Sequence, residues 1–158
     1  MRSLAVVLLL FVLSTGFAQK KKEIKKYGIR LITVNETTQG KTIPDSKSGF
    51  DSNGNLVEEV KYNKEGALKS TVRYKYNKSG DVIEESEYDE KNNLKEKRMT
   101  KYDALGQKTE ELTINAAGVQ IKKEVFVYDS RGLKIEKRIY DSTNNLITTK
   151  KTFYSKGE

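Results

Sequence analysis

A repeated turn motif constrains this chain more than any other feature of its sequence. An aromatic residue followed by Asp or Asn recurs along residues 50–141, and Ile114-Asn115 fills the one gap in the series. The motifs are separated alternately by 12 and 14 residues, so the true period is 26 residues. A fixed period of this length indicates a repeat architecture.

Each motif also carries Gly or Asn three residues after its Asp or Asn. Gly and Asn tolerate the left-handed backbone conformation, and an Asp or Asn side chain bonds to its own turn. The combination is typical of a type I turn closed by a G1 bulge, a common hairpin connection. The predicted turn positions are Asp51, Gly54, Asn63, Gly66, Asn77, Gly80, Asp89, Asn92, Asp103, Gly106, Asn115, Gly118, Asp129, Gly132, Asp141 and Asn144.

The segments between the turns have the length and composition of strands. They are rich in Val, Ile, Tyr, Thr, Lys and Glu, and several alternate apolar with polar residues. No proline occurs after Pro44, so nothing in the repeats interrupts a strand ladder. We therefore predict an all-β fold, an antiparallel meander of about eight or nine hairpin-linked strands built from 26-residue (12 + 14) repeats, as an open or curved sheet.

The tyrosines that precede the turns are the candidate ligand contacts. Even spacings preserve side-chain facing, because strand side chains alternate with a period of two. We expect rows of tyrosines near the sheet edges, with packed rings and hydroxyl groups in water. These candidates are Tyr62, Tyr76, Tyr88, Tyr102, Tyr128 and Tyr140.

The balance of charged and apolar residues limits the kind of sheet. At 33% charged and 35% hydrophobic residues, the chain is too polar for a sandwich with two apolar inner faces. Lys and Glu lie within the strand segments themselves, which predicts cross-strand ion pairs on at least one solvated face.

The first residues predict export from the cytoplasm. Arg2, an apolar run over residues 4–13 and the small residues Gly16 and Ala18 are the three parts of a signal peptide. We place it at residues 1–18, with an uncleaved N-terminal anchor as the alternative. Residues 19–49 then comprise a basic tail over 20–26, one strand over 27–34 and a loop over 36–48, followed by the repeat domain, 50–158.

The pattern Tyr-Asp-x-x-Gly resembles the YD repeat of the Rhs family. The nearest stretches are Tyr102-Asp103-Ala104-Leu105-Gly106 and Tyr128-Asp129-Ser130-Arg131-Gly132. The resemblance covers about residues 50–154 and implies a β-sheet repeat, although the chain lacks the Gly-Arg-Leu that usually follows the turn. Together with an export signal ending in Phe17-Ala18-Gln19, it is similar to uncharacterised envelope proteins of Bacteroidetes.

The residue inventory argues against an enzyme. The chain has no His, Cys or Trp, which removes the commonest general base, thiol nucleophiles and zinc sites with His or Cys ligands. We expect no cofactor and no metal. Asp51, Asn53 and Asn55 imitate the start of a calcium loop, but Tyr62 stands where its bidentate Glu is required. A carboxylate pair that cleaves glycans is the remaining catalytic hypothesis.

These features favour a non-catalytic binding module of the cell envelope or the medium. The expected partner is a polysaccharide or another envelope protein, and nucleic acid is not expected for an exported chain in which Lys and Glu alternate. The alternative is a structural spacer or assembly subunit that pairs through sheet edges and so forms oligomers. After signal cleavage the chain is not expected to span a membrane, and the periplasm, the cell surface and the medium all remain open.

Overall fold

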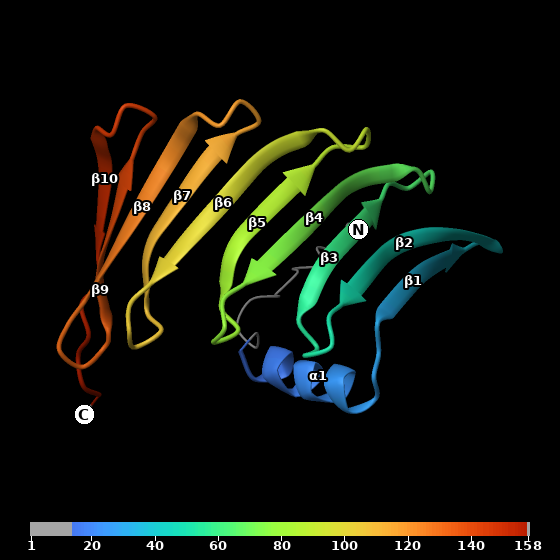
Figure 1. The fold of residues 1–158 in the computed structure, drawn as a ribbon, viewed down its shortest axis with the longest axis horizontal. Helices are drawn as coiled ribbons and strands as arrows, with labels where there is room; N and C mark the ends of the chain where they lie inside the picture. Colours follow the sequence, from blue (N-terminus) through green and yellow to red (C-terminus); the bar gives the residue numbers. More distant parts are fainter. Residues whose placement is uncertain (1–13, 158) are drawn as a thin grey trace, which may run out of the picture.

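The computed structural model describes residues 14–157 and contains one sheet and one helix. Ten antiparallel strands lie in chain order, each hydrogen-bonded to the next, so the predicted meander is confirmed and has one strand more than expected. Figure 1 shows them side by side as an open, curved sheet, with the helix at one edge. The elements are α1 (Ser14–Lys26), β1 (Leu31–Thr38), β2 (Lys41–Phe50), β3 (Leu56–Tyr62), β4 (Leu68–Tyr76), β5 (Val82–Tyr88), β6 (Leu94–Tyr102), β7 (Lys108–Asn115), β8 (Gln120–Tyr128), β9 (Lys134–Tyr140) and β10 (Leu146–Lys151).

All eight predicted turns form, and their hydrogen bonds explain the motif. In the turn at Asp103, the amide of Gly106 donates to the Asp103 carbonyl and the amide of Asp103 donates to the Gln107 carbonyl. The Asp103 carboxylate accepts from the amides of Leu105 and Gln107, both at 2.9 Å. The fourth residue of every turn has a positive φ, from 61° at Asn92 to 89° at Gly80, as a G1 bulge requires.

The turns form two rows, one at each end of the strands. Those beginning at Asp51, Asn77, Asp103 and Asp129 lie at the edge that carries α1, which we call the helix edge. Those beginning at Asn63, Asp89, Asn115 and Asp141 lie at the opposite edge. Turns in the same row are 26 residues apart, so each 26-residue repeat contributes one turn to each row.

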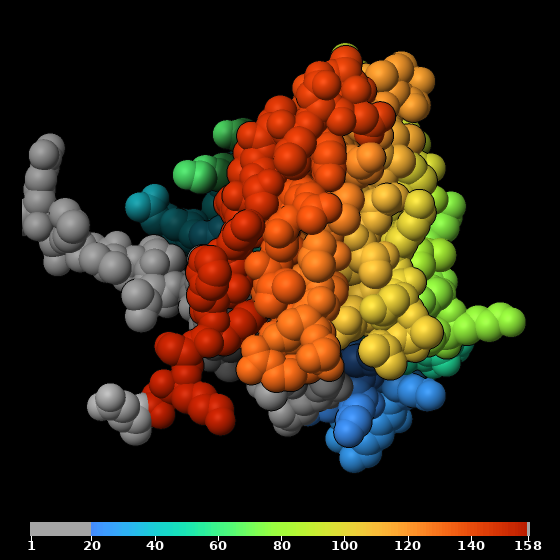
Figure 2. All heavy atoms as spheres, turned by 90° about the vertical axis from the view of Figure 1, so that its left-hand side faces the viewer, coloured from blue at the N-terminus to red at the C-terminus, as the bar shows by residue number. Residues whose placement is uncertain are grey.

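The sheet is a single layer with almost no apolar core. Among the residues whose burial is described, Ile24 of α1 is the one buried hydrophobic residue, whereas Thr71, Ser86, Thr113 and Glu124 are buried polar residues on the sheet. Figure 2 shows the sheet from the β10 end, with strands of the later repeats stacked behind one another. Strand pairing and polar contacts therefore carry much of the cohesion that a core supplies in a two-layer domain.

Cross-strand ion pairs cover this layer, as the composition predicted. Lys75 and Glu84 approach to 2.9 Å between β4 and β5, and Lys101 and Glu110 to 2.8 Å between β6 and β7. Glutamate stands at the eighth position of all four repeats, at residues 58, 84, 110 and 136. Each of the four forms an ion pair, the first three with a neighbouring strand and the fourth within β9. Each repeat therefore carries a paired glutamate at this position, although the partner differs.

The segment before the repeats differs from its prediction in two places. The loop expected over 36–48 is the end of β1 and most of β2, joined by a two-residue turn at Gln39 and Gly40, both with positive φ. Pro44 does not prevent this pairing, because the ladder shifts register where Asn35 meets Pro44 and so tolerates the missing amide donor.

The basic run expected as a solvated tail instead forms the last turns of α1. Ile24 is 3% exposed and anchors the helix to the sheet, while the lysines around it remain exposed. Helix α1 begins within the predicted signal peptide, whose residues 1–13 lie outside the described residues. No helix in the described part of the chain is long and apolar enough to cross a membrane.

Candidate ligand-binding site

The predicted tyrosine rows divide into two groups with different chemistry. At the helix edge the hydroxyl groups of Tyr76, Tyr102 and Tyr128 donate to the carbonyls of Leu56, Val82 and Lys108, at 2.7, 2.9 and 2.9 Å. Tyr154 continues the series with Lys134, also at 2.9 Å. These hydroxyls were expected in water; instead each ties the end of one strand to the start of the strand before it.

At the opposite edge the rings lie under cations. The Lys47 ammonium is 5.7 Å from the centre of the Tyr62 ring, the Arg73 guanidinium 4.6 Å from that of Tyr88, and the Lys123 ammonium 4.8 Å from that of Tyr140. Ile114 takes the fourth place in this row and offers no such ring. These contacts are within the range of a cation–π interaction.

The two groups also lie on opposite faces of the sheet. Arg73 contacts Tyr88, and Tyr76 lies an odd number of residues from Arg73 on the same strand, so Tyr76 points to the other face. The even spacing does not preserve facing, because every turn bulge adds one residue to one of the two strands it joins. The tyrosines therefore do not form one continuous binding surface.

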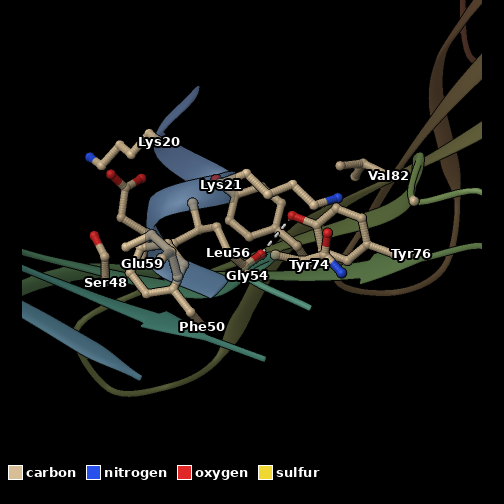
Figure 3. Close-up of a pocket in the computed structure, with 13 residues that line it drawn as sticks. Lys20, Lys21, Ser48, Phe50, Gly54, Leu56, Glu59, Tyr74, Tyr76 and Val82 are labelled. Atoms are coloured by element: carbon tan, nitrogen blue, oxygen red, sulfur yellow. Dashed lines mark hydrogen bonds between the residues drawn. The ribbon is translucent and has the colours of Figure 1, made fainter. Parts of the chain in front are cut away.

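A pocket of about 610 Å³ lies between α1 and the sheet at the helix edge (Figure 3). Strands β2 to β5 supply one wall and α1 the other. The aromatic part is made by Phe50, Tyr74 and Tyr76, and the aliphatic part by Ile24, Leu56 and Val82. Lys20, Lys21, Ser48 and Glu59 add polar groups.

A glycine lets α1 lie this close to the sheet. A Cβ atom on Gly54 would stand 2.7 Å from the Lys21 carbonyl oxygen and 3.2 Å from the Lys25 amide nitrogen. Both are helix backbone atoms that cannot move aside independently. Since Gly54 also has a φ of 76°, both the turn and the helix contact require glycine here.

The two tyrosine hydroxyls in the pocket are in different states. That of Tyr76 donates to the Leu56 carbonyl, whereas that of Tyr74 makes no hydrogen bond to another described residue. Burial, followed by the negative charges of Glu85 and Glu59, raises the pKa of Tyr74 to about 12. The Tyr74 hydroxyl is therefore a neutral group that can still donate to or accept from a ligand.

The pocket is lined by aromatic and aliphatic residues and a few polar ones. Glu59 is the single carboxylate among its lining residues, and hydrolysis by a carboxylate pair needs two. Within residues 14–157, no cluster of three acidic, His or Cys residues could hold a metal ion. Aromatic and aliphatic walls with a few polar groups are typical of small-molecule sites.

Of the predicted ligand contacts, Tyr76 alone lines this pocket. Tyr62, Tyr88 and Tyr140 lie at the other edge, and Tyr102 and Tyr128 repeat the position of Tyr76 further along the sheet. Sequence reasoning missed Tyr74 and Ile24. Two sequence signals indicate these residues. Tyr74 lies two residues before Tyr76 and so shares its face, and Ile24 is the one apolar residue in the basic run.

Comparisons of the chain with known proteins find matches among solved structures alone. No family model and no curated protein matches it. A Bacteroides fragilis protein of unknown function matches at 18% identity over 80% of this chain and 95% of that one, with a TM-score of 0.42. A DUF3836 family protein from Parabacteroides distasonis matches at 18% over 72% and 92%, with a TM-score of 0.26.

A mutant of the Staphylococcus aureus protein TarM matches at 12% identity over 79% of this chain, with a TM-score of 0.31. The matching part is 22% of TarM, so this chain spans about a fifth of that protein. The chain is structurally similar to uncharacterised proteins of Bacteroidetes.

Proposed function

We propose that this protein is an exported, non-catalytic binding module that holds part of a polysaccharide in the pocket under α1. The observation that carries the proposal is the wall formed by Phe50, Tyr74 and Tyr76 opposite the helix. The C–H faces of sugar rings pack against aromatic rings, and the sugar hydroxyls need polar partners at the margin. Tyr74, Ser48 and Glu59 offer such partners.

Export rests on the predicted signal peptide and is compatible with this pocket. Cleavage after Ala18 removes the first residues of α1 and leaves residues 19–26 of the helix. The α1 residues that line the pocket are Lys20, Lys21 and Ile24, which all follow that position. The repeat domain, which resembles the YD repeat, would then serve as the rigid support for the site in the periplasm, at the cell surface or in the medium.

Substitution of the aromatic wall tests the binding proposal. The protein should be applied to a panel of bacterial polysaccharides, with Tyr74→Ala as the variant and Tyr140→Ala as the control at the opposite edge. We expect the first to weaken binding at least about tenfold, or about 1.4 kcal/mol, and the second to leave it unchanged. Equal binding by Tyr74→Ala and the parent protein, both folded by circular dichroism, would discard the pocket.

The absence of catalysis is tested on the same panel. A reducing-sugar assay should detect no release from any polysaccharide that the protein binds. Release that disappears in Glu59→Gln would instead identify an enzyme that uses this carboxylate.

A second candidate function is assembly through the outermost strands of the sheet, and the last strand, β10, favours it. Leu146 and Ile147 of β10 are 53% and 60% exposed, although they are apolar. An exposed strand of this kind can pair with a strand of another chain. Light scattering should then show oligomers that grow with concentration and that Ile147→Lys disrupts; a strict monomer at high concentration would contradict this function.

A further inference from the structure

A second hollow lies beside the aromatic pocket and is lined by basic and amide groups. It has a volume of about 500 Å³ and lies between α1 and the helix-edge turns at Asp51 and Asn77. Its lining comprises Lys21, Lys22, Lys25, Asn53, Asn55, Asn77, Lys78, Ser79 and Gly80. Lys21, Asn55 and Gly80 also line the aromatic pocket, so the two hollows are contiguous.

We propose that this basic groove binds the anionic group of the ligand, so that the protein recognises a polysaccharide carrying sulfate, phosphate or carboxylate groups. The inference rests on the proposed function, since it assigns charge to the saccharide held in the adjoining pocket. A neutral polysaccharide would use the aromatic wall and leave the groove without a partner.

The four lysines of the groove, Lys21, Lys22, Lys25 and Lys78, are exposed and lack an ion-pair partner within the described part of the chain. On the strands, by contrast, lysines such as Lys75 and Lys101 are paired with glutamates. The positive charge of the groove is thus available to an external anion.

Lys21 lies beside both turns. Its backbone carbonyl faces Gly54, and its ammonium lies 3.4 Å from the place where a Cβ atom of Gly80 would stand. The Lys21 ammonium therefore lies beside the second turn, at ordinary van der Waals distance from that position. An anion beside Lys21 would also be near Lys78 and Ser79, which belong to that turn.

The Asp51 carboxylate, in the first turn beside the groove, is already engaged in hydrogen bonds. Asp51 accepts hydrogen bonds from the amides of Asn53 and Asn55 and from the Asn55 side chain, at 2.8, 2.9 and 2.8 Å. Burial opposes its ionisation, but the bonds from Asn55 and Asn53 and the charge of Lys21 outweigh this, so the pKa of Asp51 is lowered. Asp51 therefore acts within the turn, and the lysines remain in excess.

Asn55 supplies a second, independent indication of a ligand. The residue is 8% exposed. Its side-chain amide nitrogen donates to Asp51, which orients the group, and the Oδ1 atom has no hydrogen-bond partner among the described residues. A buried acceptor without a donor is costly. Asn55 lines both hollows, and a saccharide hydroxyl would satisfy its buried Oδ1 once a small movement of the side chain opens this oxygen to either side.

The test compares polysaccharides that differ in charge and variants that differ in the place of the charge removed. The probes are dextran, dextran sulfate and polygalacturonate of similar length, together with anionic phospholipid vesicles. The test variant is Lys21→Gln/Lys22→Gln/Lys25→Gln/Lys78→Gln, and the control is Lys41→Gln/Lys64→Gln/Lys69→Gln/Lys91→Gln. Both lose four positive charges, but the control lysines are exposed residues at the opposite edge of the sheet.

We expect at least one anionic probe to bind more tightly than dextran, and the test variant to weaken that binding by about tenfold or more. The control should change it by less than about twofold. The preference between dextran sulfate and polygalacturonate then shows whether the groove binds sulfate or carboxylate better. Equal losses in both variants would reduce the effect to net charge and overturn the inference.

Three other outcomes separate this inference from the proposed function. Dextran bound as tightly as the anionic probes, with loss in Tyr74→Ala, would retain the aromatic pocket and overturn the anion site. Binding lost in the groove variant but unchanged in Tyr74→Ala would retain the groove and overturn the pocket. Binding to anionic phospholipid vesicles, without binding to either anionic saccharide, would overturn both.

Discussion

The helix edge and the opposite edge of this sheet are built from the same type of turn, but the tyrosines beside the turns have different roles. At both edges Asp or Asn begins a turn that closes on Gly or Asn, with the same backbone bonds. At the helix edge the preceding tyrosine donates its hydroxyl proton to a carbonyl, as Tyr102 does to Val82. At the opposite edge the ring lies under a cation, as Tyr62 does under Lys47. A turn motif therefore specifies its own backbone but not the role of the residue beside it.

The origin of the difference is the bulge in every turn. One extra residue on one strand reverses which face the next tyrosine reaches, so successive tyrosines alternate between faces as well as edges. The 26-residue pair of hairpins is the smallest unit that returns a tyrosine to the same face and to the same edge. It gives the helix edge an aromatic row on the face that α1 covers, where the pocket can form.

The largest expected effect is the difference in stability between alanine substitutions at Gly54, at the helix edge, and at Gly118, at the opposite edge. Both have a positive φ, of 76° and 78°, but a Cβ atom at Gly118 would meet nothing within 4 Å. Gly118→Ala should cost about 1–2 kcal/mol from backbone strain alone. Gly54→Ala should add about 1–3 kcal/mol, because the new methyl group meets the backbone of α1.

Urea denaturation measures these two costs, and limited proteolysis shows whether α1 has left the sheet. We expect faster cleavage after the exposed lysines of α1 in Gly54→Ala only. Equal stabilities and equal cleavage in the two variants would mean that α1 does not depend on this contact.

Removal of one hydroxyl group tests the two roles of tyrosine. Tyr102→Phe should lower the free energy of unfolding by about 0.5–1.5 kcal/mol, because a part-buried hydrogen bond to the Val82 carbonyl is lost. Tyr62→Phe should change it by less than about 0.5 kcal/mol, because the Tyr62 hydroxyl has no such partner among the described residues while its ring and Lys47 remain. Denaturant melts of the two variants give the comparison; a reversed order would contradict the division of the rows.

A smaller effect is expected from the cations at the opposite edge. Lys123→Gln should cost about 0.5–1 kcal/mol, because its ammonium lies 4.8 Å from the Tyr140 ring centre and forms no ion pair with a described residue. Lys91→Gln, in a turn of the same edge, serves as the control. The same cost in Lys123→Gln/Tyr140→Leu as in Tyr140→Leu alone would confirm the pairing, whereas additive losses would contradict it.

The smallest effect distinguishes turns headed by Asp from those headed by Asn. Hydrogen bonds from the Asn93 amide and side chain lower the pKa of Asp89 below its ordinary value of 3.8. A lowered pKa contributes stability above the ordinary value, and this is lost as the pH falls through the folded-state pKa, below about pH 4. Asp89→Asn keeps the acceptor oxygen without the charge.

Melting temperatures at pH 5 and pH 3 test this. The difference between Asp89→Asn and the parent protein should shrink at the lower pH, because the parent loses a contribution that the variant never had. The same difference at both values would show that ionisation of this turn does not matter.

Much of the repeat region could be predicted because its signals are local. The bonds of the turn at Asp103 join residues no more than four apart, so the types at positions 103 and 106 are sufficient to indicate it. The N-terminal segment could not be predicted in the same way. Pro44 suggested a loop, but a register shift in the β1–β2 pair accommodates it, and the lysines of α1 concealed the anchor Ile24.

The sequence by itself determined the turns, the 26-residue period and the antiparallel meander, because each depends on backbone preferences and hydrogen bonds within a few residues. Only the tertiary structure decided which tyrosines are engaged and where a ligand could bind. The Tyr76 hydroxyl bonds to a residue 20 positions earlier, and the pocket joins α1 to four strands. Such contacts depend on the register of the strands and on the docking of α1. Both are set by the whole sheet and cannot be inferred from the type of any single residue.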